Sequence, residues 1–384
     1  MSAHAAVKRA AEIAARPWNP PAPSGRTFAR TFAIGDPQSP NENVFAILDR
    51  FGALGADGML RDDVALVSIG DHFDWNGDLA VAQAHGLRFL RWLAAHPPDQ
   101  VAILAGNHDL SRVTELWRVT DAEFTAARLL AEKIAAAPEQ PELEEQFARE
   151  CPDLPTSELA RRDYSAFTEE QRVLVQALLL AGRFALARVG RTADGRALLL
   201  THAGVTQREL AILGGDSSTR DPHAIARLLE GALAAAVDEV RPRWAAGQAA
   251  RLRLEPLHIA GTGGREGGGL LYHRPSARPD ASAAPRRFDP RTLPLGLLQA
   301  CGHAGHRKLR SDLGTWVAAS ALAVERGGLR TLRTDGEAVV YEMGIQPVAP
   351  HEGGLYMIDA EMNTIPVADY PLFELAALER TGRP

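Results

Sequence analysis

Five short segments of the sequence end an apolar run with side chains that can bind a metal ion. They are FAIGDPQ with Asp36 and Gln38, VSIGDHFD with Asp71 and Asp74, ILAGNHD with Asn107 and His108, LLTHAG with His202, and LLQACGHAGH with His303 and His306. Carboxylate, amide and imidazole groups are the usual ligands of divalent cations in proteins. A single Gly-Asp after a strand is ordinarily a turn or a helix cap. Five such segments in one chain instead indicate a metal centre.

The elements before these segments follow a regular alternation. Apolar runs at 27–34, 64–69 and 101–104 alternate with helical patterns at 43–54 and 79–95. This order is typical of βαβ units and of a mostly parallel sheet. In such a sheet ligands bind on the loops at the carboxyl ends of the strands. A glycine after each strand lets the backbone turn sharply, so we expect the ligand side chains to converge on one edge.

The rest of the chain divides into three further parts. Prolines at 17, 20, 21 and 23 lead us to expect that residues 1–26 form an arm outside the core. Between about 110 and 182 strand patterns give way to helical spacing at 121–136 and 169–180, with Thr120 and Thr168 as caps, which predicts a helical insertion. Strand-like runs at 184–189, 197–201, 257–260, 297–301, 338–343 and 355–359 predict a second sheet packed on the first. Residues 261–269 and 275–290 are expected to be surface loops.

Composition narrows the classes of protein that the chain can belong to. It has 384 residues, 46% hydrophobic and 23% charged, which is ordinary for a globular protein. The formal charge of −6 gives no general attraction to nucleic acid or to an acidic membrane, so metal ions or a few arginines must draw in an anionic substrate locally. Two cysteines and the lack of a secretory signal or a membrane-spanning run lead us to expect a cytoplasmic protein.

Taken together, the segments resemble the calcineurin-like metallophosphoesterases, whose pattern runs GD-x-H, GD-x-x-D, GNH-D/E, H-x-G and GH. The resemblance covers roughly residues 28–360. GNHD, THAG and GHAGH look most like the phosphoprotein-phosphatase branch, which includes Shewanella-like phosphatases and symmetrical dinucleoside tetraphosphatases; GGLLYHRP and LYMIDAEM agree with it. The resemblance implies an α/β fold, a sandwich of two mixed β-sheets flanked by helices. One phosphoesterase domain would span 27–384, with the helical insertion at about 110–182 unmatched.

The resemblance also implies roles for individual residues. One metal ion would be held by Asp36, Gln38 and Asp71, and a second by Asp71, Asn107, His202 and His303, so that Asp71 bridges the two. Such metal pairs activate a bridging water that attacks the phosphorus. His108 would be the general acid that protonates the leaving group, and Asp74 would orient its imidazole.

Three departures from the family pattern qualify this assignment. Gln38 stands where most members have His, which makes the first site rich in oxygen and favours Mn²⁺, with Mg²⁺, Fe or Zn as alternatives; His72 could replace the missing imidazole. The arginine that usually follows the second aspartate is absent after Asp74, so Arg112 and Arg274 are the candidates for gripping the phosphate. His306 lies three residues after His303 and is expected near the ligands, facing substrate, or as a plain loop histidine.

These residues favour a phosphatase that hydrolyses phosphoester bonds in phosphoproteins, small phosphoesters or nucleotides. Gln38 and the missing arginine leave a second reading open, a hydrolase of dinucleoside polyphosphates. A third reading, a catalytically silent metal-binding interaction protein, is disfavoured because His108 and Asp74 are dispensable for metal binding and yet present. Neither a membrane nor nucleic acid is expected as a partner.

Overall fold

The strands that precede the first three ligand segments pair side by side in one five-stranded sheet. The computed structural model, which describes residues 3–75, 77–215, 219–262 and 264–379, places β1 (Arg30–Ile34), β2 (Val64–Ser68) and β3 (Val101–Leu104) parallel to one another. Short β4 (Phe184–Ala185) continues the parallel side, and β15 (Phe373–Leu375) pairs antiparallel with β1. Every residue of β2 and β3 is buried, as expected for parallel strands covered on both faces.

A second, seven-stranded sheet has the order β13-β12-β14-β11-β6-β5-β16. β11 pairs parallel with β6 and with β14, whereas the other pairs are antiparallel, so this sheet is mixed as well. Its strands are β5 (Ala187–Arg191), β6 (Ala197–Thr201), β11 (Leu298–Cys301), β12 (Arg330–Thr334), β13 (Val339–Met343), β14 (Gly353–Met357) and β16 (Ala377–Leu378). Two minor ribbons join β7 (His258–Ile259) to β8 (Gly268–Gly269) and β9 (Arg274–Pro275) to β10 (Arg287–Phe288).

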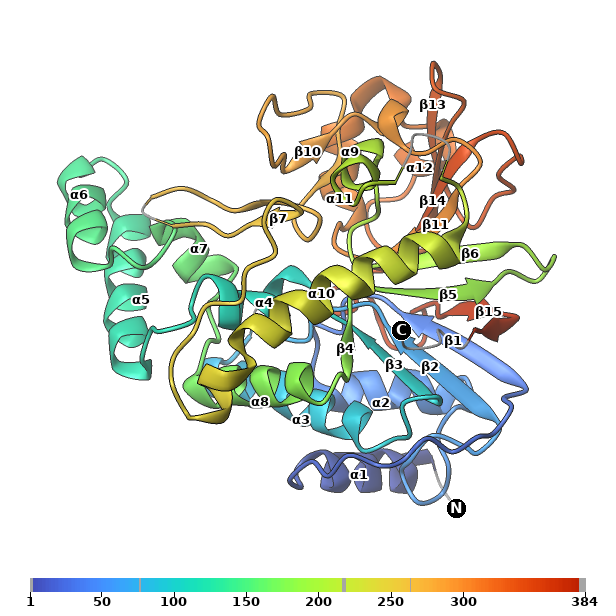
Figure 1. Cartoon of the computed structure of the whole chain (residues 1–384), viewed down its shortest axis with the longest axis horizontal. Helices are drawn as coiled ribbons and strands as arrows, with labels where there is room; N and C mark the ends of the chain where they lie inside the picture. Colours follow the sequence, from blue (N-terminus) through green and yellow to red (C-terminus); the bar gives the residue numbers. More distant parts are fainter. Residues whose placement is uncertain (1–2, 76, 216–218, 263, 380–384) are drawn as a thin grey trace.

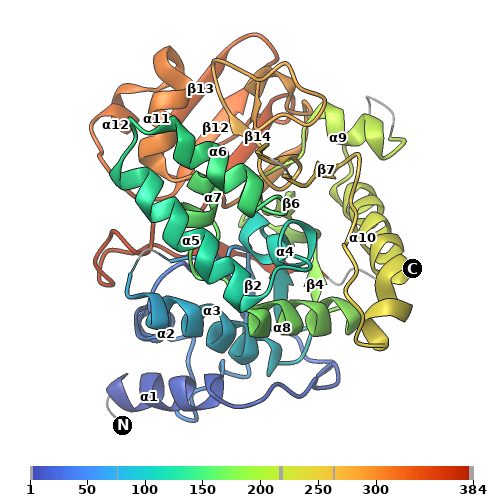
Figure 2. The same cartoon turned by 90° about the vertical axis from the view of Figure 1, so that its left-hand side faces the viewer.

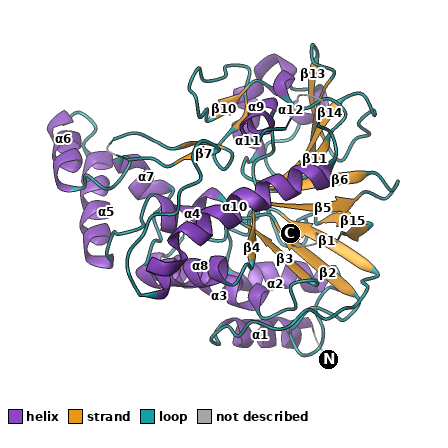
Figure 3. Cartoon of the chain, viewed as in Figure 1, coloured by secondary structure: helices purple, strands orange, loops and turns teal. Residues whose placement is uncertain are grey.

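The two sheets pack face to face. Val67 and Leu104 from the first sheet share a buried apolar cluster with Leu198, Leu200 and Ala300 from the second. Removal of these aliphatic side chains from water is the main force that holds the layers together. The prediction of an α/β protein with two mixed sheets flanked by helices is therefore confirmed (Figure 3).

Helices cover the outer faces of both sheets (Figure 1). On the first sheet α2 (Asn41–Arg50), α3 (Leu79–Ala94) and α8 (Glu169–Leu180) share a core with the strands, and α10 (Pro222–Ala245) runs from α8 to β5 and β6. On the second sheet α11 (His306–Leu313) and α12 (Ala319–Leu322) pack over β12 to β14, and α9 (Gln207–Ile212) follows β6. No helix in the described ranges combines the length and the apolar character needed to traverse a bilayer.

Residues near the N-terminus do not form the arm that the prolines suggested. Helix α1 (Ala3–Ala14) lies beside α2 and α3, and both views show it against them (Figures 1 and 2). Ala6, Ala10 and Ala14 are buried, and their small side chains at a spacing of four let the helix approach closely. The prolines lie beyond the helix, where Trp18 Nε1 donates to Ala94 O at 2.8 Å. The expectation of an arm outside the core is thus wrong for α1, because the prolines end the helix without detaching it.

The segment between β3 and β4 is helical, as predicted, and residues 110–182 contain no strand. Its helices are α4 (Asn107–Thr114), α5 (Asp121–Ala136), α6 (Pro141–Glu150), α7 (Ser157–Arg162) and α8. Only α5 to α7 have a core of their own, which includes Phe124 and Phe147, and they project from the sheets (Figures 1 and 2). Helices α4 and α8 belong to the main core. The expected caps form, since Thr120 accepts from Glu123 N and Thr168 from Gln171 N.

Candidate metal centre

The predicted ligand side chains come from loops at the carboxyl ends of neighbouring strands. Asp36 follows β1, Asp71 follows β2, Asn107 and His108 follow β3, His202 follows β6 and His303 follows β11. The backbone there is strained: the positive φ values of non-glycine residues in the described chain fall on Asp36 (28°), Asp71 (54°), Asp74 (63°), His303 (69°) and Glu361 (55°). Left-handed φ values in such residues are unfavourable and concentrate at functional sites. The residues with strained backbone are therefore largely the same residues that follow the strands at the predicted metal site.

Asp71, His202 and His303 form a group that could hold a metal ion, since each offers a ligand atom and these atoms all lie within 4.8 Å of one another. His202 Nε2 lies 3.4 Å from Asp71 Oδ1 and 3.1 Å from Asn107 Oδ1, so the Asn107 amide oxygen belongs to the same cluster. The His202 and His303 rings lie edge to face with centres 5.0 Å apart. The structure therefore brings together the four residues expected at the second metal position.

The hydrogen bonds of the two histidines leave one nitrogen of each ring for a cation. His202 Nδ1 donates to Ile69 O at 2.8 Å, and His303 Nε2 donates to Tyr272 O at 2.8 Å. Such bonds to backbone carbonyls fix the tautomer and the orientation of metal-binding histidines. The other nitrogen of His303, Nδ1, is buried and has no hydrogen-bond partner among the described residues. A buried polar atom without a partner is costly, and coordination of a cation would relieve that cost.

The electrostatics of the cluster point the same way. Burial alone would lower the pKa of His202, but Asp71 outweighs it and raises the pKa to about 9, so a proton sits where a cation would bind. Burial and the neighbouring His202 lower the pKa of His303, which leaves its Nδ1 lone pair free. Burial, Asp359 and Asp71 raise the pKa of Asp36 well above its ordinary value. A cation bound between the carboxylates of Asp36, Asp71 and Asp359 would stabilise their ionised forms.

The residues expected at the first metal position line the same cavity, which has a volume of about 350 Å³. Both carboxylate oxygens of Asp36 accept from His303 N, at 3.0 and 2.8 Å. Gln38 Nε2 donates to Phe73 O at 2.8 Å, so its Oε1 is the atom left for a cation. Together with Asp71 these groups offer only oxygen atoms.

Three acids that line this cavity, Asp163, Asp359 and Glu361, were not assigned a role from the sequence. Asp359 and Glu361 follow β14 and line the cavity beside Asp36. Glu361 N donates to Asp359 Oδ1 at 2.9 Å, and burial raises the pKa of Asp359. The signal was present in the LYMIDAEM segment, which ends a strand with an aspartate in the same way as the other ligand segments.

His108 and Asp74 form the pair expected of a general acid and the group that orients it. His108 Nδ1 donates to Asp74 Oδ2 at 2.9 Å, and its Nε2 lies 3.8 Å from Asp71 Oδ2. Burial alone would lower the pKa of His108, but Asp71 and Asp74 raise it to about 10, so the ring is protonated at neutral pH. The imidazole faces the cavity with a proton to give.

Arg112 does not reach the cavity, so the expectation that it grips substrate is wrong. Its side chain is fully buried and makes a two-pronged ion pair with Asp74, through Nη1 at 2.6 Å and Nη2 at 2.9 Å. Nε and Nη2 also donate to Gln171 Oε1, and the guanidinium lies 4.6 Å from the centre of the Phe73 ring. The physical reason is that the buried carboxylate of Asp74 requires a counter-charge, which α4 supplies one turn after His108. Arg112 thus acts through Asp74.

Two further histidines point away from the cavity. His306 begins α11 and is buried, with Nδ1 2.7 Å from the Tyr341 hydroxyl and its ring stacked on that tyrosine, so neither a place near the ligands nor contact with substrate is correct. His72 Nδ1 pairs with the Asp109 carboxylate at 3.0 Å, and Nε2 bonds Ser68 Oγ at 2.8 Å. His72 therefore does not replace the missing imidazole at position 38.

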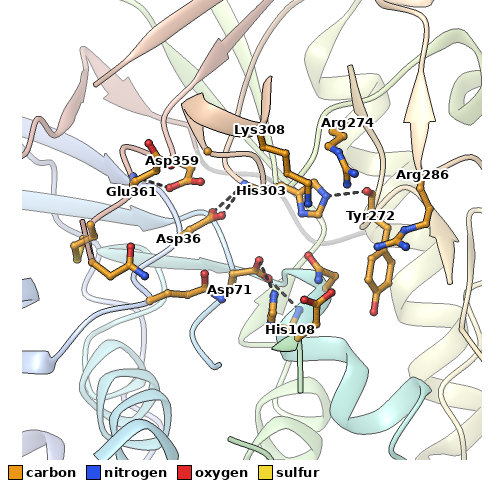
Figure 4. Close-up of a pocket in the computed structure, with 16 residues that line it drawn as sticks. Asp36, Asp71, His108, Tyr272, Arg274, Arg286, His303, Lys308, Asp359 and Glu361 are labelled. Carbon is orange, nitrogen blue, oxygen red and sulfur yellow. Dashed lines mark hydrogen bonds and ion pairs between the residues drawn. The ribbon is translucent and has the colours of Figure 1, made fainter. Parts of the chain in front are cut away.

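Positive side chains form the wall of the cavity opposite the acids. Arg274 lies there as expected, and Arg286 and Lys308, which the sequence did not single out, lie beside it (Figure 4). Figure 4 shows these three on one side, and Asp36, Asp359 and Glu361 on the other. Acidic side chains thus predominate on one side of the cavity and basic side chains on the other, although Asp163 also lines the cavity.

Comparison with known proteins finds no matching family model, no matching curated protein and no matching solved structure.

Proposed function

We propose that the chain is a dinuclear-metal-dependent phosphatase of the calcineurin-like superfamily, close to its phosphoprotein-phosphatase branch, and that it hydrolyses phosphoester bonds in the cytoplasm. The observation that best supports this proposal is the arrangement of side chains at the cavity. The unpartnered Nδ1 of His303 lies near Asp71 and His202, and protonated His108 lies beside Asp71. A phosphatase needs a metal centre, a proton donor and a positive surface for the phosphoryl oxygens, and side chains that could supply each of these line or adjoin this cavity. The free cysteines Cys151 and Cys301 suit a reducing compartment.

The donor atoms support two different cation positions. Asp36, Gln38 and Asp71 would hold one ion through oxygen alone, which suits Mn²⁺ or Mg²⁺ better than Zn²⁺. Asp71, Asn107, His202 and His303 would hold the other with two oxygens and two nitrogens. When bound, such a pair polarises the phosphoryl group and makes a bound water acidic enough to attack near neutral pH.

The chain's own residues would then handle the proton and the leaving group. Asp74 holds His108 through Nδ1, so that Nε2 carries a proton into the cavity for the departing alkoxide. Arg112 keeps Asp74 ionised and fixed, because burial would raise the pKa of Asp74 but the guanidinium and His108 lower it. Arg274 can receive the phosphoryl oxygens on the opposite wall.

The alternative of a dinucleoside polyphosphate hydrolase uses the same machinery and draws support from the additional cations of the wall. The alternative of a silent interaction protein is opposed by the Arg112–Asp74–His108 arrangement. A buried ion pair that positions a proton donor has no use in metal binding alone.

The test is turnover by protein stripped of metal with a chelator and reloaded with Mn²⁺, Mg²⁺ or Zn²⁺. The substrates are p-nitrophenyl phosphate, its bis ester, a phosphopeptide and diadenosine tetraphosphate. Mn²⁺-dependent turnover of at least one is expected, and its absence with all four would remove the enzyme hypothesis.

Two variants sharpen the test. His108→Asn should lose roughly 10²–10⁴-fold in turnover, the usual contribution of a positioned general acid, while retaining bound metal. His351→Asn changes an exposed histidine that does not line the cavity, and is the matched control with unchanged turnover. Loss of metal from His108→Asn would contradict the assignment of His108 as the acid.

A further inference from the structure

The cavity carries more positive charge on one wall than a single phosphoryl group at a metal pair requires. Arg274 reaches it from β9, Arg286 from the residue before β10, and Lys308 from the first turn of α11. These elements lie far apart in the sequence, and the fold gathers their cations at one place (Figure 4). In a chain with a formal charge of −6, such a cluster is a local feature and not a reflection of overall charge.

The three cations differ in their partners. Arg274 Nε donates to Asp312 Oδ2 at 2.8 Å, and Arg286 pairs with Glu266. Asp163, the acid on this side of the cavity, is engaged by Arg162 Nε at 2.6 Å. Lys308 has no ion-pair partner in the ranges that the structure describes. The wall therefore holds two arginines with carboxylate partners and one lysine without an ion pair, whose charge Asp163 offsets only at longer range.

The cations also repel one another. Loss of solvation and the neighbouring Arg274 lower the pKa of Lys308 to about 8, although the residue keeps access to solvent. Like charges that line one cavity repel one another, and an anion bound between them relieves that repulsion. Arginine forks and a lysine point charge are the groups that proteins use to bind phosphate.

We propose that Lys308 and Arg286, beside Arg274, form a second anion subsite, so that the substrate is a small molecule with two phosphate groups. The phosphate that is cleaved would lie on the metal-ligand side of the cavity, and the second would lie against Lys308 and Arg286. A cavity of about 350 Å³ is at the lower end of the range for small-molecule sites, which favours a compact bisphosphate or phosphoanhydride over a protein chain. The inference rests on the proposed function for the identity of the cleaved group, but the binding of the second phosphate does not depend on turnover.

The test measures binding of methylenebisphosphonate, which carries two phosphonate groups and is not hydrolysed, against binding of inorganic phosphate. Titration calorimetry is done on Mn²⁺-loaded protein at fixed free Mn²⁺. Lys308→Met should weaken methylenebisphosphonate binding by about tenfold or more, the worth of one charge-assisted hydrogen bond, and should weaken phosphate binding by much less. Arg286→Gln should act in the same direction, and Lys308→Arg should restore most of the affinity.

Arg307→Met is the matched control, because Arg307 is the exposed neighbour of Lys308 on α11 and does not line this cavity. It should leave both affinities unchanged. If Lys308→Met weakens the binding of methylenebisphosphonate and of phosphate equally, or weakens neither, the proposal of a second subsite is wrong. If the wild-type protein shows no turnover but Lys308→Met selectively weakens methylenebisphosphonate binding, the proposed function is wrong and the second subsite stands.

Discussion

Replacement of Arg112 by methionine tests the positioning of the proton donor. Arg112 and Asp74 both have fully buried side chains, and their ion pair is two-pronged. In Arg112→Met, Asp74 would keep only the bonds from His108 Nδ1 and Ala166 N, and its charge would stay in the interior. Removing one partner of a buried pair costs about 3–5 kcal/mol when the other charge is left uncompensated, and protonated His108 would offset only part of that loss. That is a large part of the 5–15 kcal/mol that stabilises a typical domain.

The assay is urea denaturation, read as a shift in midpoint at constant slope. Arg118→Met is the matched control, because Arg118 pairs with Asp153 at the surface, where such pairs contribute roughly 0–1 kcal/mol. The double variant Asp74→Asn with Arg112→Met should be less destabilised than the sum of the single variants, by about 1–3 kcal/mol. A loss below about 1 kcal/mol in Arg112→Met, similar to the control, would refute the argument that the pair is buried and fixes Asp74.

Two further predictions concern the ligands and a buried histidine remote from the site. His303→Ala removes the unpartnered Nδ1 and should weaken Mn²⁺ binding by at least about 100-fold, beyond the usual effect of losing a supporting residue, whereas His351→Asn should bind normally in the same titration. His96 accepts from Leu60 N and donates to Trp92 O, and burial lowers its pKa from 6.5 to about 4. Because the unfolded chain binds a proton that the folded chain excludes, His96 contributes its full stabilisation above pH 6.5 and loses about 3 kcal/mol of it as pH falls to 4. Urea titrations from pH 7 to 4 should show a shallower decline for His96→Gln, and equal slopes would contradict this reasoning.

The convergence of Asp36, Asp71, Asn107, His202 and His303 was predictable because it follows from topology. Each residue ends a strand, and parallel strands bring their carboxyl ends to one edge. The pairing of His108 with Asp74 was instead expected from the resemblance to the metallophosphoesterases, and the two side chains lie 2.9 Å apart. Turn residues and the succession of strands along the chain are local features, and a single sequence shows them directly.

The role of Arg112 was not predictable, since it depends on burial by α8 and on Gln171, 59 positions away. Arg286 and Lys308 were missed for the same reason, because the elements that carry them meet at the cavity only in the folded chain. Helix α10 was also not predicted, but for a different reason. Asp221 caps it, Pro222 occupies its first turn, and Ile225, Leu229 and Leu233 form a buried stripe at helical spacing, so the sequence held the signal although no element was predicted there.

The proposed function requires two cations that share Asp71 in one cavity. Anomalous diffraction from crystals grown with Mn²⁺, measured near the manganese edge, locates such ions. We expect two peaks, one bounded by Asp36, Gln38 and Asp71 and the other by Asp71, Asn107, His202 and His303. No peak in this cavity at saturating Mn²⁺, or a peak that contacts neither Asp71 nor His303, would contradict it.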